Sequence, residues 1–274
     1  MLRPVSPRIA VEGLAKRYGQ AAALQGVTVD IEPGEFVAII GRSGAGKTTF
    51  LRCLSGAVPP SEGRIGLDGE DLASLAAQGL RRHRARVGMI YQQFNLVRRL
   101  RVLDNVLVGR LPHLGGWRRL AALAWRFDAH ESEIALRCLA HVGLVDRAWQ
   151  RTDTLSGGEQ QRVAIAKILA QDPALILADE PIASLDVVNG ALVMETLRRV
   201  ASESGLTVIA TLHHMELALR YADRILGFRA GTLVFDGPPA ALDEAAAGRV
   251  FGQPATVVAP PAAAALGQPE WAVS

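Results

Sequence analysis

The stretch FVAIIGRSGAGKTTFLRCL, residues 36–54, decides the fold. It starts with the apolar run Phe36–Ile40, continues through the glycine-rich loop GRSGAGKT at residues 41–48, and ends in a segment with helical periodicity. The loop fits the pattern G-x-x-x-x-G-K-S/T, in the strand–loop–helix context that this pattern requires. The stretch therefore predicts an α/β protein with a phosphate-binding loop between a buried strand and a helix.

The composition of this loop suits a nucleotide and its metal. Glycines let backbone N–H groups turn towards phosphate oxygens, and the helix N-terminus adds partial positive charge. Lys47 can reach the β- and γ-phosphates, and the Thr48 hydroxyl can bind Mg²⁺. A chance glycine turn is the alternative, but it does not explain the flanking strand and helix. The residues predicted to contact ATP here are Gly41, Arg42, Ser43, Gly44, Ala45, Gly46, Lys47, Thr48 and Thr49.

A second apolar run, LILADE at residues 175–180, ends in two adjacent carboxylates. Ligands gather at the carboxyl ends of the strands in open α/β sheets. Asp179 is therefore predicted to bind Mg²⁺, mostly through water, and Glu180 to act as general base on the attacking water. A salt-bridging acidic pair is the alternative, and the phosphate-binding loop argues against it.

Strand-like and helix-like segments alternate along most of the chain, which predicts a parallel sheet flanked by helices. Pro33-Gly34 is predicted to be a hairpin turn between strands 27–31 and Phe36–Ile40, and Asp68-Gly69 another turn. Further strands are predicted at residues 8–14, 64–67, 87–91, 175–178, 207–211, 224–228 and 233–235. Helices are predicted at residues 48–54, 157–170, 187–202 and 215–221 and throughout 93–151, and the Ala- and Pro-rich residues from 254 onward are predicted to be irregular.

Composition limits the class of protein. The 274 residues are 49% hydrophobic and 21% charged, which is ordinary for a globular protein. No apolar run approaches the roughly 18 residues that span a bilayer, and the start lacks the apolar core of a secretory signal. We therefore expect the chain in the cytosol unless a partner holds it elsewhere. Cys53 and Cys138 are predicted to be buried, reduced thiols.

The formal net charge is +3, and arginines cluster at residues 81–86 and 98–101. Such a basic patch can bind nucleic acid or anionic lipid, although more often it is a solvated face. Because no base-stacking or groove-reading motif lies nearby, nucleic acid is not predicted as a partner. The role of the arginine clusters stays open.

The stretch LSGGEQQR, residues 155–162, resembles the signature of the ABC ATPases nearly letter for letter. Physically it is a helix N-terminus with a serine and two glycines, suited to a γ-phosphate, although a plain serine cap is the simpler alternative. The resemblance implies that Ser156, Gly157 and Gly158 face the ATP of a second copy, so that two chains enclose two nucleotides. It also implies a phosphate-loop NTPase (RecA-like) parallel sheet with an antiparallel β subdomain and a helical signature subdomain.

The other matches follow the order of the family along the chain. Tyr18 looks like the aromatic residue that stacks on adenine, although a tyrosine at a strand end is often plain packing. Gln92 resembles the glutamine that senses magnesium and the attacking water, and its neighbour Gln93 is the alternative. These assignments come from the resemblance.

Two motifs in the second half complete the set. Ser184-Leu185-Asp186 resembles the loop that crosses the dimer interface, so Asp186 is expected near nucleotide. His213 resembles the histidine that contacts the γ-phosphate, with His214 as the alternative, and the order Thr-Leu-His departs mildly from the commoner Thr-His. The resemblance thus assigns catalysis to Glu180, His213, Gln92 and Lys47, and the metal to Thr48, Gln92 and Asp179.

The resemblance spans about residues 8–241, and it implies an ATPase domain at 8–252, with a helical subdomain at about 93–160 and a tail at 253–274. A single ATPase domain without a membrane span fits an importer subunit. The implied partners are a second copy, membrane-spanning permease subunits that dock near Gln93, and indirectly a solute-binding protein. The implied location is peripheral, on the cytoplasmic face of the inner membrane.

Residues 95–100, Trp117-Arg118, 176–186 and 211–221 look most like phosphonate importer ATPases, and the bulky insert 114–127 favours the same group. ATPases that import polar amino acids or methionine share much of this pattern and remain an alternative. A non-transport ABC ATPase acting on DNA or ribosomes is less favoured, because no coiled-coil insertion or second ATPase domain is present. A regulator that only binds nucleotide is disfavoured because Lys47, Asp179, Glu180 and His213 are all present.

Overall fold

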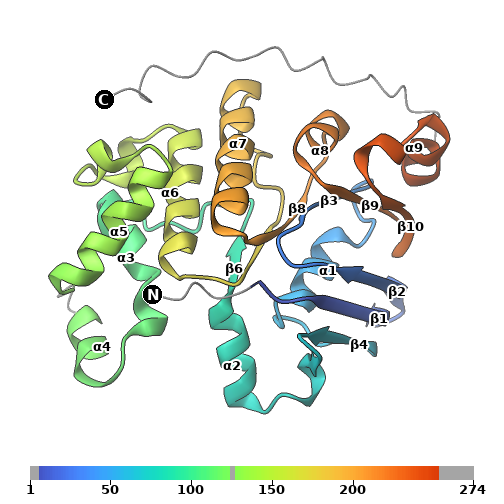
Figure 1. The fold of residues 1–274 in the computed structure, drawn as a ribbon, viewed down its shortest axis with the longest axis horizontal. Helices are drawn as coiled ribbons and strands as arrows, with labels where there is room; N and C mark the ends of the chain where they lie inside the picture. The colour runs from blue at the N-terminus through green and yellow to red at the C-terminus, as the bar shows by residue number, and fades with distance from the viewer. Residues whose placement is uncertain (1–5, 124–126, 253–274) are drawn as a thin grey trace.

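The computed structural model describes residues 6–123 and 127–252, which form two sheets and the helices around them (Figure 1). Within these residues the larger sheet has the strand order β10-β9-β3-β8-β7-β6, and the smaller sheet has the order β2-β1-β4-β5. The strands are β1 (Ile9–Tyr18), β2 (Ala21–Ile31), β3 (Phe36–Ile40), β4 (Glu62–Leu67), β5 (Glu70–Asp71), β6 (Val87–Ile90), β7 (Leu175–Ala178), β8 (Thr207–Thr211), β9 (Arg224–Arg229) and β10 (Thr232–Gly237).

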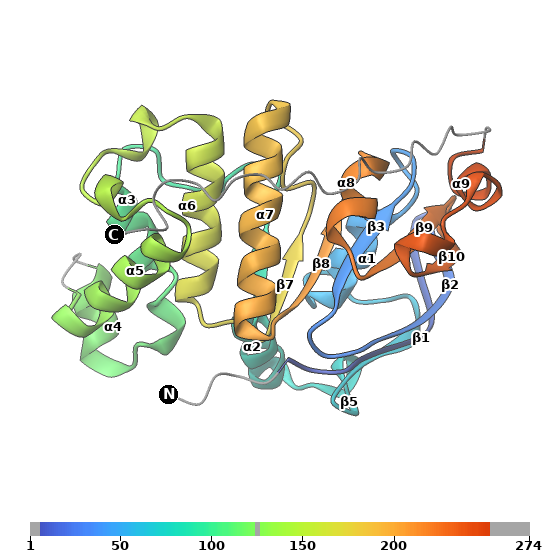
Figure 2. The same ribbon diagram turned by 45° about the horizontal axis from the view of Figure 1, so that its top comes forward.

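The helices lie beside and between these sheets in both views (Figures 1 and 2). They are α1 (Lys47–Leu54), α2 (Ala77–Arg86), α3 (Val102–Val108), α4 (Gly116–Leu123), α5 (Ala129–His141), α6 (Gly157–Ala170), α7 (Val187–Ser204), α8 (Met215–Tyr221) and α9 (Glu244–Phe251). Short 3₁₀ turns lie at Leu72–Ser74, Leu111–His113, Val145–Arg147, Thr152–Thr154 and Pro239–Ala241.

The larger sheet is parallel except for β10, which pairs antiparallel with β9. All five residues of β3 are buried, and alternate side chains point to opposite faces. Phe36, Ala38 and Ile40 belong to one hydrophobic core, whereas Val37 and Ile39 belong to another. A sheet covered on both faces explains why its strands are continuous apolar runs. The predicted parallel α/β sheet is confirmed.

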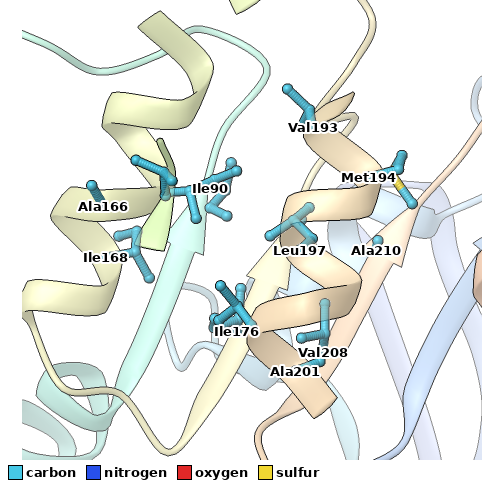
Figure 3. Close-up of a cluster of buried hydrophobic side chains, with 14 of the residues drawn as sticks. Ile90, Ala166, Ile168, Ile176, Val193, Met194, Leu197, Ala201, Val208 and Ala210 are labelled. Atoms are coloured by element: carbon cyan, nitrogen blue, oxygen red, sulfur yellow. The ribbon is translucent and has the colours of Figure 1, made fainter. Parts of the chain in front are cut away.

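The first core lies between the sheet and the helices α6, α7 and α8. Figure 3 shows side chains of α6 and α7 directed towards those of β6, β7 and β8, among them Ile168, Ile176, Leu197 and Val208. Gly88 in β6 allows this contact, because a Cβ there would lie 2.2 Å from Ile168 Cγ2. Burial of apolar area at about 25 cal/mol per Å² is the main term that holds α6 and α7 on the sheet.

The second core lies on the opposite face of the sheet. There α1 and the antiparallel sheet cover Val37, Ile39 and Phe228, with Phe50 of α1 at 5.3 Å from Phe228 between ring centroids. The antiparallel β subdomain expected from the resemblance is therefore present, formed by β1, β2, β4 and β5.

Beyond α6, a helical layer is formed by α3, α4 and α5, as predicted for the region after Gln93. A buried ion pair ties this layer together, because Arg110 Nε lies 2.6 Å from Glu131 Oε2 and Arg110 also donates to the Ala170 carbonyl of α6. Arg118 of α4 joins the network through Asp128 and Glu131. The insert 114–127 is thus anchored to α5 at its α4 end.

One turn was predicted wrongly. Pro33-Gly34 does not join a hairpin, because β2 pairs with β1 in the antiparallel sheet whereas β3 pairs with β8 and β9 in the parallel sheet. A local turn signal indicates a change of direction, but tertiary pairing decides which strand lies alongside. Asp68-Gly69 does join the hairpin of β4 and β5, and both residues have positive φ.

The predicted domain limits 8–252 and 93–160 stay predictions, and the second limit falls in the first turn of α6. The predicted irregular tail 253–274 lies outside the described residues. In the part of the chain that the structure describes, no helix has both the length and the apolar character needed to cross a membrane.

Candidate active site

The loop between β3 and α1 has a backbone that only glycine tolerates at two positions. Gly41 has φ +147°, and a Cβ there would lie 2.3 Å from the Phe228 carbonyl oxygen. Gly46 has φ +100°, and a Cβ there would lie 2.5 Å from the Ala23 carbonyl oxygen. Glycine therefore allows the loop to pack against β9 and β2. The first N–H groups of α1 have no intrahelical acceptor, so they can bind an anion.

Lys47 lies inside this loop rather than extending into solvent. It is 5% exposed, and its Nζ donates to the carbonyl oxygens of Gly41 at 2.7 Å and Arg42 at 3.1 Å. Burial lowers the pKa of Lys47, while the charges of Glu180 and Asp179 act to raise it. The ammonium group is thus held within the loop, with two carboxylates nearby, a position suited to a phosphate.

A chain of hydrogen bonds joins α1, β7 and β8 at the carboxyl edge of the sheet. The Thr48 hydroxyl donates to Asp179 Oδ1 at 2.9 Å, and the Thr211 hydroxyl donates to the same oxygen at 3.1 Å. Thr211 Oγ1 also accepts the Glu180 N–H at 2.8 Å and is fully buried. Thr211 was not among the predicted site residues. The sequence pattern that could have indicated Thr211 is a hydroxyl residue at the end of an apolar strand.

Glu180 faces His213 across this edge. His213 Nε2 lies 2.5 Å from Glu180 Oε1. Glu180 has φ +50°, an unusual conformation for a residue with a side chain, and such strain is concentrated at functional sites. The bond from its N–H to Thr211 and the bond from the Ala183 N–H to its carbonyl hold this conformation. The carboxylate is thereby fixed beside Asp179 and Thr211, where it can accept a proton.

The oxygen donors at this edge fit magnesium. Mg²⁺ prefers oxygen ligands and is usually held by one or two carboxylates together with phosphates and water. Thr48 Oγ1 and Asp179 Oδ1 lie close enough to share one cation. Among the described residues no group of three or more His, Cys, Asp and Glu side chains could form a metal cage.

A second group of predicted residues lies at the N-terminus of α6. Ser156 caps this helix, and with Glu159 it forms a capping box in which each side chain accepts the backbone N–H of the other. A Cβ at Gly158 would lie 2.6 Å from Asn189 Oδ1, and one at Gly157 would lie 3.3 Å from Leu185. The glycines therefore allow α6 to approach the start of α7.

Asp186 caps α7 in the same neighbourhood. Its side chain accepts the Asn189 N–H at 2.9 Å and the Asn189 side-chain amide at 2.6 Å. These bonds from Asn189 lower the pKa of Asp186. The N-termini of α6 and α7 therefore lie side by side.

The structure thus sorts the predicted residues into separate groups. One group (Lys47, Thr48, Asp179, Glu180 and His213) meets at the carboxyl edge of the sheet, and the other (Ser156, Gly157, Gly158 and Asp186) lies at the starts of α6 and α7. Across the residues described, no hydrogen bond or ion pair joins the two groups. Around Lys47 and Thr48, the loop has Arg42, Ser43 and Gly44 exposed, Ala45 buried and Thr49 half-buried.

In the described part of the chain, Tyr18 and Gln92 form no hydrogen bond or ion pair with either group. Tyr18 is 48% exposed at the end of β1, with Lys16 Nζ 5.3 Å from the centre of its ring. Gln92 and Gln93 are both exposed beyond the end of β6. Of the two candidate histidines, the geometry favours His213, because it bonds Glu180. His214 is exposed and lies at the N-cap position of α8.

Comparison with known proteins identifies the family of this chain. Residues 24–183 match the family model described as ABC transporter. The chain is 48% identical over 250 residues to the phosphonates import ATP-binding protein PhnC of Bradyrhizobium diazoefficiens, covering 91% of this chain and 92% of that protein. It is 45% identical to the PhnC of Thiobacillus denitrificans, covering 89% of this chain and 92% of that protein.

Solved structures agree on the fold. The chain resembles the ATP-binding cassette MJ0796 in a dimeric post-hydrolysis state bound to ADP and Pi, with TM-score 0.72 and 32% identity over 84% of this chain and 98% of the other. Another dimeric structure of MJ0796 gives TM-score 0.73 and 33% identity, with the same coverage of both chains.

Proposed function

This chain belongs to the ABC transporter family of ATP-binding proteins, and from that premise we propose that it is the ATP-hydrolysing subunit of a phosphonate importer. The observation that carries the proposal is the Thr48–Asp179–Thr211–Glu180–His213 chain at the carboxyl edge of the sheet. Similarity over nine-tenths of the chain to phosphonate import ATP-binding proteins supports the substrate class. It also favours phosphonate over polar amino acids or methionine.

Each of these residues has a separate role in the proposed reaction. The glycine loop and Lys47 bind and orient the β- and γ-phosphates, and Glu180 accepts the proton of the attacking water. His213 bonds the Glu180 carboxylate and would contact the γ-phosphate. Mg²⁺, held by Thr48 and Asp179 with Gln92 nearby, would neutralise charge on the phosphate oxygens.

We further propose that two copies enclose two nucleotides. In the part of the chain that the structure describes, no bond joins the residues around Lys47 to Ser156, Gly157, Gly158 or Asp186. These four residues are therefore free to serve the nucleotide of a second copy. Tyr18 would stack on the adenine of its own site. The dimeric structures of MJ0796 support such an assembly.

In this proposal the protein lies on the cytoplasmic face of the inner membrane, held by permease subunits that dock near Gln93. Closing of the dimer around ATP would move the docking regions and the permease with them. A solute-binding protein would deliver the phosphonate to the permease, and the phosphonate itself would never touch this chain.

Glu180→Gln tests the catalytic assignment. We expect the variant to bind ATP and to accumulate as a dimer, while hydrolysis falls about 10²- to 10⁴-fold, the usual contribution of a general base. Glu195→Gln, an exposed glutamate on α7, is the matched control and should leave turnover unchanged. Undiminished phosphate release by Glu180→Gln would reject the role of Glu180.

Transport of the substrate is tested separately. Cells that depend on this chain should take up a radiolabelled phosphonate, and Glu180→Gln should stop that uptake. Uptake that continues while the purified variant has lost hydrolysis would reject phosphonate import but leave the ATPase assignment intact.

A further inference from the structure

The arginine cluster at residues 81–86 lies on α2, a helix that its neighbours hold in place. Gln171 donates to the carbonyl oxygens of Ala85 and Val87 at the end of the helix. His83 bonds the Leu54 carbonyl at 2.9 Å, and Arg84 donates to the Gly56 carbonyl at 2.6 Å. These contacts fix α2 against the end of α1, so the backbone that carries its outward side chains is held in position.

Among the described residues, the arginines of α2 lack acidic partners, whereas several arginines elsewhere have them. Arg8, Arg64, Arg151, Arg198 and Arg224 all form ion pairs with Asp or Glu. Within residues 6–123 and 127–252, no carboxylate forms an ion pair with any arginine of α2. The four arginines, Arg81, Arg82, Arg84 and Arg86, are exposed, and we define them as the α2 basic surface.

Stabilisation of the helix dipole accounts for only two of the four arginines of α2. Cations in the last turn of a helix interact favourably with its dipole, which explains Arg84 and Arg86. Arg81 and Arg82 lie before the last turn. The nearest acidic residues along the chain are Glu70 and Asp71, which lie before the intervening 3₁₀ turn, and Asp71 accepts the Ala73 N–H.

The position of α2 keeps this surface away from the candidate active site. Arg86 directly precedes β6, so α2 ends at the amino edge of the parallel sheet, while Asp179 and Glu180 lie beyond its carboxyl edge, about 13 Å along a four-residue strand. In both views α2 projects from the same lower edge of the molecule as α4 (Figures 1 and 2). Trp117 of α4 is 76% exposed. A ligand of the α2 basic surface would not block the nucleotide.

We propose that the α2 basic surface binds the phosphate headgroups of anionic lipids. Guanidinium groups pair with phosphate in a bidentate manner, and basic residues near an anionic leaflet contribute about 1 kcal/mol each. The choice of lipid over nucleic acid rests on the proposed function, which locates the chain at a membrane. The surface adds an attachment that is independent of the permease.

The test uses the purified full chain and two kinds of vesicle, phosphatidylcholine alone and phosphatidylcholine containing phosphatidylglycerol. We expect co-sedimentation with the anionic vesicles that weakens as salt rises. Arg81→Gln/Arg82→Gln should lower the affinity about 30-fold, from two residues at about 1 kcal/mol each. The control Arg8→Gln/Arg64→Gln removes the same charge from exposed residues that are already paired, and it should change the affinity much less.

Equal losses in the two double variants would overturn the proposal, because net charge rather than α2 would then be responsible. Absence of binding to anionic vesicles would also overturn it. Preferential binding of a DNA or RNA duplex, lost in Arg81→Gln/Arg82→Gln, would assign the surface to nucleic acid instead. ATP hydrolysis measured on the same samples separates failure of this proposal from failure of the proposed function.

Discussion

Replacing Thr211 by Val removes the hydroxyl that joins Asp179 to Glu180. Thr211 Oγ1 donates to Asp179 at 3.1 Å and accepts the Glu180 N–H at 2.8 Å, and the residue is fully buried. In this variant the buried Glu180 N–H loses its acceptor, which should lower the free energy of unfolding by about 1–3 kcal/mol. The lost hydrogen bond to the charged Asp179 is worth about 1.5–3 kcal/mol. If this hydrogen bond stabilises the transition state by the same amount, its loss lowers kcat roughly 10- to 150-fold.

Thr207 of the same strand provides a matched control. It too is fully buried, and its hydroxyl accepts a backbone N–H, that of Gly34 at 2.9 Å. Thr207→Val should therefore lower the free energy of unfolding by a similar amount, about 1–3 kcal/mol, because one buried N–H again loses its acceptor. Thr207 lies at the amino end of β8, away from Asp179, so kcat should be unchanged.

The assays are urea unfolding for stability and steady-state phosphate release for kcat. The reasoning requires similar losses of stability and a selective loss of turnover in Thr211→Val. If both variants keep the turnover of the parent chain, the Thr211 hydroxyl is structural and plays no part in positioning Asp179 and Glu180. If both lose turnover equally, the defect comes from destabilised β8 rather than from the site.

Three further predictions follow from packing and helix ends. Ser156→Arg should keep its nucleotide affinity as a monomer but lose ATP-driven dimerisation, and a normal dimer on a sizing column would contradict the role of Ser156. Gly158→Ala should lower the free energy of unfolding by about 1–3 kcal/mol, since its Cβ would lie 2.6 Å from Asn189 Oδ1, and Asn189→Ala should recover part of the loss in a urea titration. Burial raises the pKa of the Cys53 and Cys138 thiols to about 11, so at pH 8 both should react with a thiol reagent only after unfolding, and rapid labelling of the folded chain would refute this.

Much of the fold could be predicted from the sequence because local pattern and tertiary environment agree. The helix Gly157–Ala170 and the strands Leu175–Ala178 and Thr207–Thr211 have the bounds that the pattern predicts. Continuous apolar runs bounded by polar residues are typical of strands buried on both faces, and Ser156 with Glu159 marks a helix start. The free, buried thiols of Cys53 and Cys138 were likewise expected.

Other features depended on contacts between distant segments. Residues 77–86 were noted only for their arginines, yet they form α2, because His83 and Arg84 bond the end of α1 and Gln171 caps the last turn. The failed hairpin at Pro33-Gly34 has the same origin, since pairing with β8 and β9 outweighs the local turn signal. Thr211 acquires its role only because β8 lies beside β7.

The sequence by itself determined the nucleotide chemistry of this protein. The glycine loop with Lys47 and Thr48 is one short stretch of chain, and the carboxylates after a buried strand are another. Each of these local patterns predicts its chemistry without coordinates. The tertiary structure alone decided which of these groups meet. Strand order brings Thr211 to both Asp179 and Glu180, and it brings His213 to Glu180. Helix packing brings Gly158 to Asn189. These contacts join residues far apart in sequence, so local patterns do not reveal them.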